Sequence, residues 1–210
     1  MPPPASPSTD PTSPPDAPSS SGPDEDPPLD TLRRRLGDGD ETAFERIFRR
    51  LSTSVFRFVC GMVQDEALAH DITQDTFAKL WTIRDRMDTV DSLQAYVFQM
   101  ARHRVYNHQR DQQVRRDNAA TLEATRPDAT PPSPDQSLDA DLLRALLERW
   151  IGELPDRQRE ALLLRRQEDL SHDEIAEAMD IAPSTVNNHL VRAMKALRGR
   201  LREHRPDLLA

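Results

Sequence analysis

The chain has 210 residues, of which 36% are hydrophobic and 30% charged, with 18 prolines, six glycines and a single cysteine. This length allows one or two small domains beside unfolded segments and disfavours a large enzyme built on one core. A single cysteine excludes a disulfide within the chain and fits a reducing compartment. The net charge of −8 argues against a general coat for nucleic acid. Basic residues nevertheless concentrate in segments 96–116 and 181–202, which predicts local phosphate contacts.

The first 28 residues differ in composition from the rest of the chain. They contain eleven prolines and five acidic residues but no basic one, which predicts a disordered tail. They lack the basic start and the apolar run of about 7–15 residues that a secretory signal needs. The longest aliphatic run, Ala161 to Leu164, is far short of the roughly 20 residues that span a bilayer. We therefore expect a soluble, cytoplasmic protein that does not insert into a membrane.

Three amphipathic helices are predicted in the first half of the folded chain. The first covers about 20 residues, and its hydrophobic side chains recur every three or four positions: Phe44, Phe48, Leu51, Val55, Phe58 and Met62. The second follows a polar break at Gln64 and Asp65 and extends to about Arg86. The third runs from Ser92 to about Arg116. Three long helices with short connections predict an antiparallel bundle.

The second half of the chain also reads as helical, after a break. Residues 117–139 lose the periodicity and contain several prolines, which predicts a flexible linker. Four helices are expected beyond it, the second over 156–167, the third starting at a capping box of Ser171 and Glu174, and the fourth opened by Pro183. No strand-like alternation, glycine-rich phosphate loop or repeat appears. The fold class expected is all-α, with two small helical domains joined by the linker.

The last two predicted helices have the spacing of a helix-turn-helix. The outward face of the second helix carries short hydrogen-bonding side chains followed by cations: Ser184, Thr185, Asn187, Asn188, His189, Arg192 and Lys195. In the major groove, Asn can pair with adenine, and Arg with guanine or phosphate. Residues 181–202 hold five basic side chains and no acidic one, whereas the solvated face of an ordinary helical hairpin would mix both signs. The pattern favours DNA binding.

Both halves of the chain resemble the sigma-70 family of RNA polymerase sigma factors. Segments 154–160, 170–176 and 184–190 are similar to region 4 of that family. Segment 71–77 resembles region 2.2, and segment 95–110 resembles regions 2.3 and 2.4. Two modules joined by a short linker are typical of the extracytoplasmic-function (ECF) subgroup.

The resemblance implies that successive segments of the chain have different functions. A tail at 1–28 would precede region 2 at 29–116, which docks on core polymerase and recognises and melts the −10 element. The linker at 117–139 would lead to region 4 at 140–205, whose helix-turn-helix recognises the −35 element. Such a protein directs transcription initiation and is not an enzyme. We expect no catalytic residue, no cofactor and no metal site.

The resemblance also assigns individual residues. Region 2.2 of the family docks on the clamp helices of the β′ subunit, and the matching positions are Asp71, Gln74 and Asp75, which share one helix face. Residues expected at the −10 element lie on the third predicted helix: Arg102, His103, Arg104, Tyr106, Asn107 and Arg110. The chain departs from the family pattern at His103, where Asn is common, and at Asn107, where Asp is common. The outward face of the last helix is expected at the −35 element.

The partners implied are core RNA polymerase, through its β′ clamp helices and β flap, duplex promoter DNA and the melted −10 strand. The resemblance also implies an anti-sigma factor that holds the two modules together and hides both DNA faces. A stand-alone regulator with a LuxR-like helix-turn-helix is the alternative, because segment 184–190 is similar to that class too. Such a regulator would carry a receiver or ligand-binding domain in place of a basic helical bundle. A non-DNA-binding adaptor would not need the basic helix at 96–116.

Overall fold

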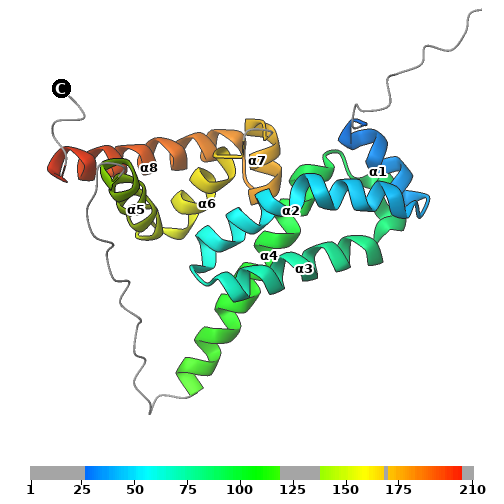
Figure 1. The fold of residues 1–210 in the computed structure, drawn as a ribbon, viewed down its shortest axis with the longest axis horizontal. Helices are drawn as coiled ribbons and strands as arrows, with labels where there is room; N and C mark the ends of the chain where they lie inside the picture. The colour runs from blue at the N-terminus through cyan, green and yellow to red at the C-terminus, as the bar shows by residue number, and fades with distance from the viewer. Residues whose placement is uncertain (1–26, 119–137, 168–169, 205–210) are drawn as a thin grey trace, which may run out of the picture.

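The computed structural model describes residues 27–118, 138–167 and 170–204, which form helices and their connections (Figure 1). The elements in chain order are α1 (Leu29–Gly37), α2 (Glu41–Val63), α3 (Glu66–Thr82), the 3₁₀ helix η1 (Arg84–Thr89), α4 (Leu93–Asn118), α5 (Leu138–Gly152), α6 (Asp156–Arg165), α7 (His172–Met179) and α8 (Pro183–His204). The described ranges contain no strand, which confirms the all-α prediction. The ends of the predicted linker are helical, and its remaining residues, 119–137, lie outside the described part of the chain.

Helices α1 to α4 form an N-terminal module (Figure 1). Its buried hydrophobic side chains belong to one cluster that continues into helices α5 to α8. The stripe predicted on α2 is buried at Leu51, Val55 and Phe58. Phe58 meets Phe98 of α4 edge to face, with ring centroids 5.6 Å apart. Edge-to-face pairs add to the free energy gained by burying the rings, so this contact fixes α4 against α2.

Helix α1 was not predicted from the sequence, so the N-terminal bundle contains four α-helices and not three. Its Leu32 and Leu36 are fully buried, and the helix packs against α2 and η1. The nine-residue helix is mostly polar and includes three consecutive arginines, which obscure the helical spacing of its leucines. Asp40 then caps α2 by accepting hydrogen bonds from the amides of Thr42 and Ala43. Bonds from Thr42 and Arg35 hold the pKa of Asp40 well below its usual range.

The second predicted helix is shorter than expected. It was predicted to reach Arg86, but α3 ends at Thr82 and the chain continues as η1. Arg84 donates a hydrogen bond of 2.8 Å to the Trp81 carbonyl and stacks over the Trp81 ring. A side chain that satisfies one of the last carbonyls can end a helix. Arg33 of α1 donates to the carbonyl of the buried Met87 and holds η1 in place.

Helices α5 to α8 form the C-terminal module, which contains the predicted helix-turn-helix. The capping box of Ser171 and Glu174 opens α7, as predicted. Asp180 ends α7 in the left-handed conformation with φ of 54°, and α8 begins at Pro183 after a short turn. The buried Ile175 and Val186 pack α7 against α8. The turn and its packing therefore present the opposite face of α8 to solvent.

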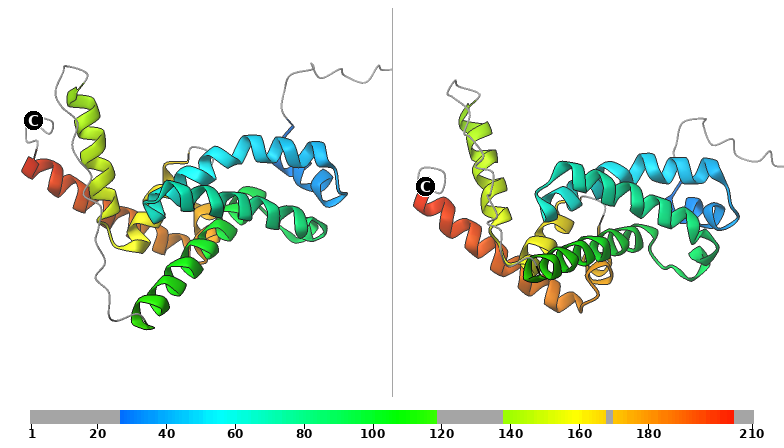
Figure 2. Two further views of the ribbon diagram at one scale, coloured as in Figure 1. Left: turned by 60° about the horizontal axis from the view of Figure 1, so that its bottom comes forward. Right: turned by 90° about the horizontal axis from the view of Figure 1, so that it is seen from below.

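The two modules pack directly against each other, which the sequence analysis did not predict. Helix α7 lies against α4, and α6 lies against α2 (Figure 2). Gly61 of α2 permits this approach, because a Cβ there would lie 2.7 Å and 2.8 Å from the two methyl carbons of Leu163 on α6. The close packing of the two modules at this point therefore depends on a glycine in α2.

The edge-to-face pair generates a stability prediction. We expect Phe98→Ala to lower the free energy of unfolding by about 3–5 kcal/mol, because it removes a fully buried ring and leaves a cavity. Urea unfolding followed by circular dichroism measures the change. Val114→Ala on the same helix, at a side chain that is 52% exposed, is the control and should change stability by less than about 0.5 kcal/mol. Equal effects of the two substitutions would contradict the packing described.

Candidate nucleic-acid interface

The exposed face of α8 carries the residues that the sequence analysis assigned to duplex DNA. Ser184, Asn187, Asn188, Arg192 and Lys195 are exposed, and Thr185 and His189 are half-buried. The opposite face is buried and hydrophobic, at Val186, Ala193 and Leu197. The structure therefore brings the seven predicted residues onto one helix of the helix-turn-helix. Hydrogen-bonding groups lie near the start of the helix and cations lie further along.

The six residues assigned to α4 fall into three groups. His103, Asn107 and Arg110 are exposed to solvent. Arg104 is half-buried, and its Nη1 lies 3.2 Å from Oδ2 of Asp75 on α3. Arg102 and Tyr106 face the C-terminal module, and Arg102 is only 7% exposed. All six were expected to be available to DNA, whereas Arg104 is paired within its own module and Arg102 and Tyr106 are engaged by the other module.

Arg102 and Tyr106 meet a carboxylate from the other module. Glu160 of α6 has no exposed surface, and its Oε1 lies 2.5 Å from Nε of Arg102. The two atoms form an ion pair without the alignment of a hydrogen bond. The Tyr106 hydroxyl donates a hydrogen bond of 2.8 Å to Oε2 of Glu160, and Arg157 of α6 donates to the same oxygen at 3.3 Å. We call these four residues the Glu160 cluster.

The Glu160 cluster raises the pKa of its tyrosine. Burial raises the pKa of the Tyr106 hydroxyl, and the negative charge of Glu160 and the hydrogen bond to it raise the pKa further. The guanidinium groups of Arg102 and Arg157 lie 5.1 Å and 5.5 Å from the centre of the Tyr106 ring. Cations at such distances are attracted to the face of an aromatic ring. The ring, the two cations and the carboxylate thus contact one another across the module boundary.

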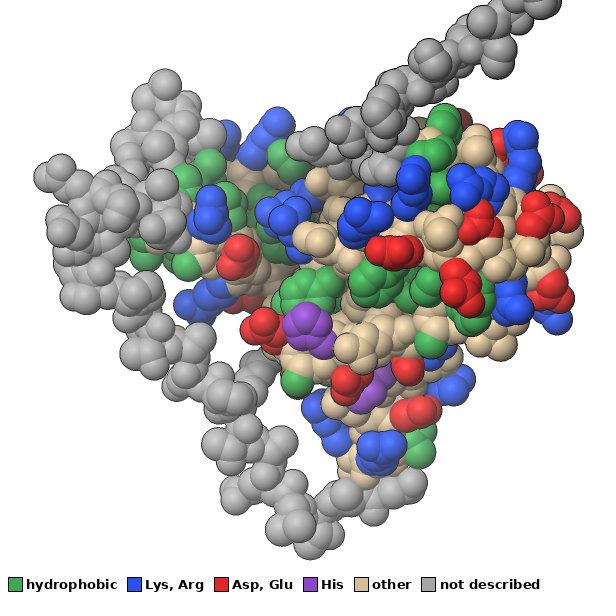
Figure 3. All heavy atoms as spheres, turned by 45° about the vertical axis from the view of Figure 1, so that its right-hand side comes forward, with side chains coloured by type: hydrophobic (Ala, Val, Ile, Leu, Met, Phe, Trp, Pro, Cys, Tyr) green, Lys and Arg blue, Asp and Glu red, His purple; other side chains and the backbone are tan. Residues whose placement is uncertain are grey.

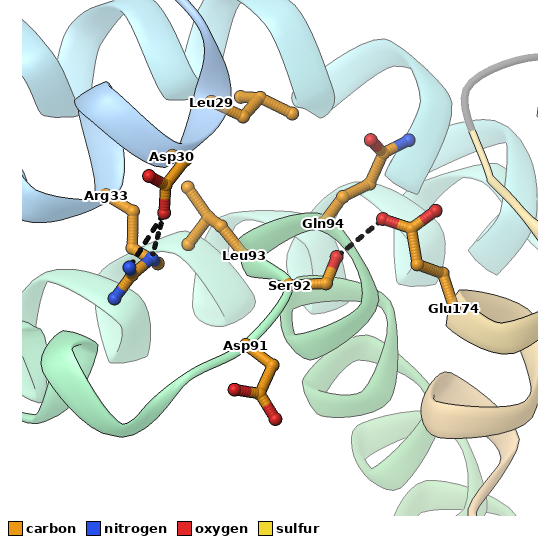
Figure 4. A pocket seen from close by; sticks show the side chains of 8 residues that line it. All are labelled: Leu29, Asp30, Arg33, Asp91, Ser92, Leu93, Gln94 and Glu174. Carbon is orange, nitrogen blue, oxygen red and sulfur yellow. Dashed lines mark hydrogen bonds and ion pairs between the residues drawn. The ribbon is translucent and has the colours of Figure 1, made fainter.

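A second polar contact joins the modules at the start of α4. The Ser92 hydroxyl donates a hydrogen bond of 2.7 Å to Oε1 of Glu174 on α7, beside a shallow pocket between α1, α4 and α7 (Figure 4). Ser92 also caps α4 by accepting a bond from the Ala95 amide. Burial raises the pKa of Glu174, but hydrogen bonds from the amide and hydroxyl of Ser171 and from Ser92 outweigh it and lower the pKa overall.

The residues assigned to polymerase docking lie on the outer face of α3. Asp71, Gln74 and Asp75 are exposed, while Ile72 and Phe77 on the opposite face are buried. The structure therefore places the three predicted residues on one accessible helix face.

An aromatic band lies between α2 and α3, and Figure 3 shows hydrophobic side chains along this side of the module. Phe48 is 41% exposed, with its ring 4.9 Å from that of Phe77. Phe56 stacks on His70 with ring centres 4.4 Å apart. Phe48 was predicted to be buried, because it follows the hydrophobic spacing of α2. Helical spacing alone does not show that no neighbouring helix covers this position fully.

The described part of the chain offers neither a metal site nor a membrane span. No three His, Cys, Asp or Glu residues there are grouped so that they could hold a metal ion. None of the described helices combines the length and the apolar character of a membrane span.

Comparison with known proteins matches both modules to one family. The family model "Sigma-70 region 2" matches residues 47–115, and "Sigma-70, region 4" matches residues 144–197. The RNA polymerase sigma factor CarQ of Myxococcus xanthus is 31% identical over 174 residues, which are 80% of this chain and 95% of CarQ. The ECF RNA polymerase sigma factor SigK of Mycobacterium sp. (strain KMS) is 26% identical over 176 residues, 81% of this chain and 89% of SigK.

The fold also matches solved structures. The sigma factor RpoE from Bartonella quintana, solved in complex with the anti-sigma factor NepR, has 20% identity and a TM-score of 0.60, covering 77% of this chain and 98% of the other. CnrH, solved in complex with the cytosolic domain of CnrY, has 19% identity and a TM-score of 0.59, covering 83% and 97%. These two likenesses concern the arrangement of helices.

The low pKa of Glu174 generates a pH prediction. A carboxyl group whose pKa falls on folding stabilises the folded state above its ordinary value of 4.5, and the contribution is lost as the pH falls through the folded pKa. We expect Glu174→Gln to be less stable than the wild type at pH 7 and the difference to shrink below about pH 4.5. Thermal unfolding at several pH values measures it.

Glu177 on the same helix is the matched control with the opposite sign. Burial and the charges of Asp91 and Glu174 raise the pKa of Glu177, so its ionised form opposes folding at neutral pH. Glu177→Gln should therefore equal or exceed the wild type in stability at pH 7. A pH-independent loss of stability in Glu174→Gln would refute the role given to its charge.

Proposed function

Because the chain belongs to the sigma-70 family of RNA polymerase sigma factors, in the ECF subgroup, we propose that separate helix faces carry its contacts with polymerase and promoter. The chain binds core RNA polymerase and directs promoter-specific initiation of transcription through −10 and −35 elements. Within this proposal region 2 spans residues 29–116 and region 4 spans residues 140–205. The observation that carries the proposal is the exposed row of hydrogen-bonding and cationic side chains on α8, mounted on a helix-turn-helix. Relatives of this kind are not enzymes, and we assign no catalytic residue.

Helix α8 reads the −35 element. Asn187 and Asn188 are exposed near its start and can form paired hydrogen bonds with adenine in the major groove. Arg192 and Lys195 are exposed one and two turns further along, where cations contact phosphates or guanine. Ser184, Thr185 and His189 complete the set. Phosphate contacts position the helix and base contacts supply the sequence preference.

Helix α4 binds the −10 element. Arg102, Arg104 and Arg110 supply cations for the backbone, and His103 and Asn107 supply groups for base edges. Tyr106 offers a ring on which an unstacked base can stack. Melting without ATP requires that such contacts offset the few kcal/mol lost for each unstacked base. The segment 87–91, which covers the end of η1 and the residues that follow it, is where a flipped base would lodge.

The outer face of α3 docks on core polymerase. Asp71, Gln74 and Asp75 would contact the β′ clamp helices, with the neighbouring aromatic band as an apolar extension of this face. Exposed aromatic side chains beside polar groups are typical of protein interfaces. Region 4 would contact the β flap. The place of action is the cytoplasm, where core polymerase transcribes.

An anti-sigma factor is a further proposed partner. The solved relatives from Bartonella quintana and CnrH were captured with an anti-sigma factor and with CnrY respectively. Their fold is shared by this chain. A stand-alone LuxR-like regulator is not favoured, because the first module matches sigma-70 region 2 over residues 47–115.

Run-off transcription from a genomic promoter library tests the function. We expect purified chain with sigma-free core polymerase to initiate at sites that share two motifs about two helical turns, roughly 70 Å, apart. In the same assay, Asn187→Ala with Asn188→Ala should relax the upstream motif and keep the downstream one, because only α8 is altered. Binding of duplex DNA without any initiation would instead support a stand-alone regulator.

Substitution on α3 tests the docking face. We expect Asp71→Ala, Gln74→Ala and Asp75→Ala together to weaken binding to core polymerase about tenfold or more, because central interface residues contribute on the order of 2 kcal/mol. Fluorescence anisotropy of labelled chain with core polymerase measures this. Glu41→Ala with Glu45→Ala removes two exposed acidic groups from α2 of the same module and should bind as the wild type does. Undiminished binding of the triple variant would exclude the assigned face.

A further inference from the structure

We propose that the free chain inhibits itself selectively: Glu160 of region 4 occupies the −10 binding pair Arg102 and Tyr106, while the −35 reading face of α8 stays open. The inference rests on the proposed role of α4 at the −10 element. It concerns the chain without a partner, and it assigns the inhibition to one carboxylate.

The chemistry of the Glu160 cluster resembles that of a bound nucleic-acid strand. A guanidinium and a tyrosine hydroxyl both contact the oxygens of one carboxylate, at 2.5 Å and 2.8 Å. Arginine and tyrosine bind phosphate oxygens in the same manner. Glu160 thus presents two negative oxygens where a strand of DNA would present its own. DNA and Glu160 cannot both occupy Arg102 and Tyr106.

The Glu160 cluster takes two residues from each module. Arg157 and Glu160 lie one turn apart on α6 and contact each other within region 4. Arg102 and Tyr106 belong to region 2. When the modules separate, Glu160 therefore keeps one cationic partner, while Arg102 and the Tyr106 hydroxyl are released to solvent or DNA. The released pair is the one that the −10 strand requires.

The buried charges also make the contact reversible. Arg102 and Glu160 have side chains that are 8% and 0% exposed, and removing two charges from water offsets much of their attraction. The ion pair therefore specifies how the modules fit together more than it holds them together. Core polymerase, which must hold regions 2 and 4 on separate promoter elements, can displace it.

Two further contacts join region 4 to region 2. Glu174 of α7 accepts a hydrogen bond from Ser92 next to segment 87–91, where a flipped base would lodge (Figure 4). Ser92 and Tyr106 are 14 residues apart, or roughly 20 Å along α4. Leu163 of α6 packs on Gly61 of α2. Region 4 therefore contacts region 2 on both α4 and α2, and not at Glu160 alone.

The −35 face of α8 is not covered by the other module. Asn187, Asn188, Arg192 and Lys195 remain exposed in the same arrangement. An anti-sigma factor that hides both DNA faces would block both elements. The closed chain should instead bind −35 duplex normally and −10 single strand poorly.

Binding of the full-length free chain to two DNA probes tests the proposal. One probe is a fork with a single-stranded −10 motif and the other a duplex with the −35 motif alone, both taken from a promoter mapped by run-off transcription. We expect Glu160→Gln to bind the −10 fork about tenfold or more tightly than the wild type, because a competent state populated at about 10% or less raises the apparent Kd by that factor. Binding to the −35 duplex should not change. Fluorescence anisotropy measures both.

The matched control is Glu153→Gln, which makes the same charge change in region 4. Glu153 pairs with Arg200 at 2.8 Å within its own module, so both probes should bind as they do to the wild type. Gly61→Leu opens the contact from the region 2 side, because its side chain would overlap Leu163. It should tighten −10 binding as Glu160→Gln does. Circular dichroism and thermal unfolding show which variants are folded. If Glu160→Gln does not fold, Gly61→Leu provides the test of the proposal.

The outcomes separate the inference from the function on which it rests. Folded variants that bind the −10 fork no better than the wild type would overturn the inference while run-off initiation stands. Equal tightening by Glu153→Gln would overturn it too, since charge alone would then explain the effect. If Arg102→Ala in the Gly61→Leu background leaves −10 binding unchanged, the assignment of Arg102 to the −10 element fails, and the inference fails with it.

Discussion

A carboxylate without any exposed surface can persist only where cations and donors surround it. Glu160 meets this requirement with one arginine of its own helix and with an arginine and a tyrosine of the other module. The need to pair this buried charge therefore helps to fix the relative position of the modules. The two modules also share one hydrophobic cluster, in which Leu163 packs on Gly61.

Much of the fold could be predicted from interactions between residues that are close together in the sequence. The capping box at Ser171 and the start of α8 at Pro183 depend on neighbouring residues, and the structure has both. Helix α1 was not predicted because a short, mostly polar helix is stabilised by its tertiary contacts and not by its own sequence pattern. Here these contacts are with η1 and α2. The end of α3 was misplaced because Arg84 reaches back to the Trp81 carbonyl, and no periodicity reports such a bond.

The candidate site was predictable as a set of residues but not as an arrangement. Polar and basic side chains on α8 follow from helical spacing, and the structure leaves them exposed. The burial of Arg102 depends on Glu160, 58 positions further along the chain, and the Ser92 bond depends on Glu174. Pairs at such separation leave no pattern in a single sequence. The contact between the modules could therefore not be predicted from the sequence.

The withdrawal of Arg102 from solvent has a consequence for how the chain meets bulk DNA. Each phosphate that a protein neutralises releases condensed counterions, and the affinity for non-specific DNA grows with the number of such contacts. A chain that keeps one arginine of α4 paired internally displaces fewer ions from arbitrary sequence. Its affinity for arbitrary genomic DNA should therefore be lower than if Arg102 were free, which leaves more of the chain available to bind polymerase.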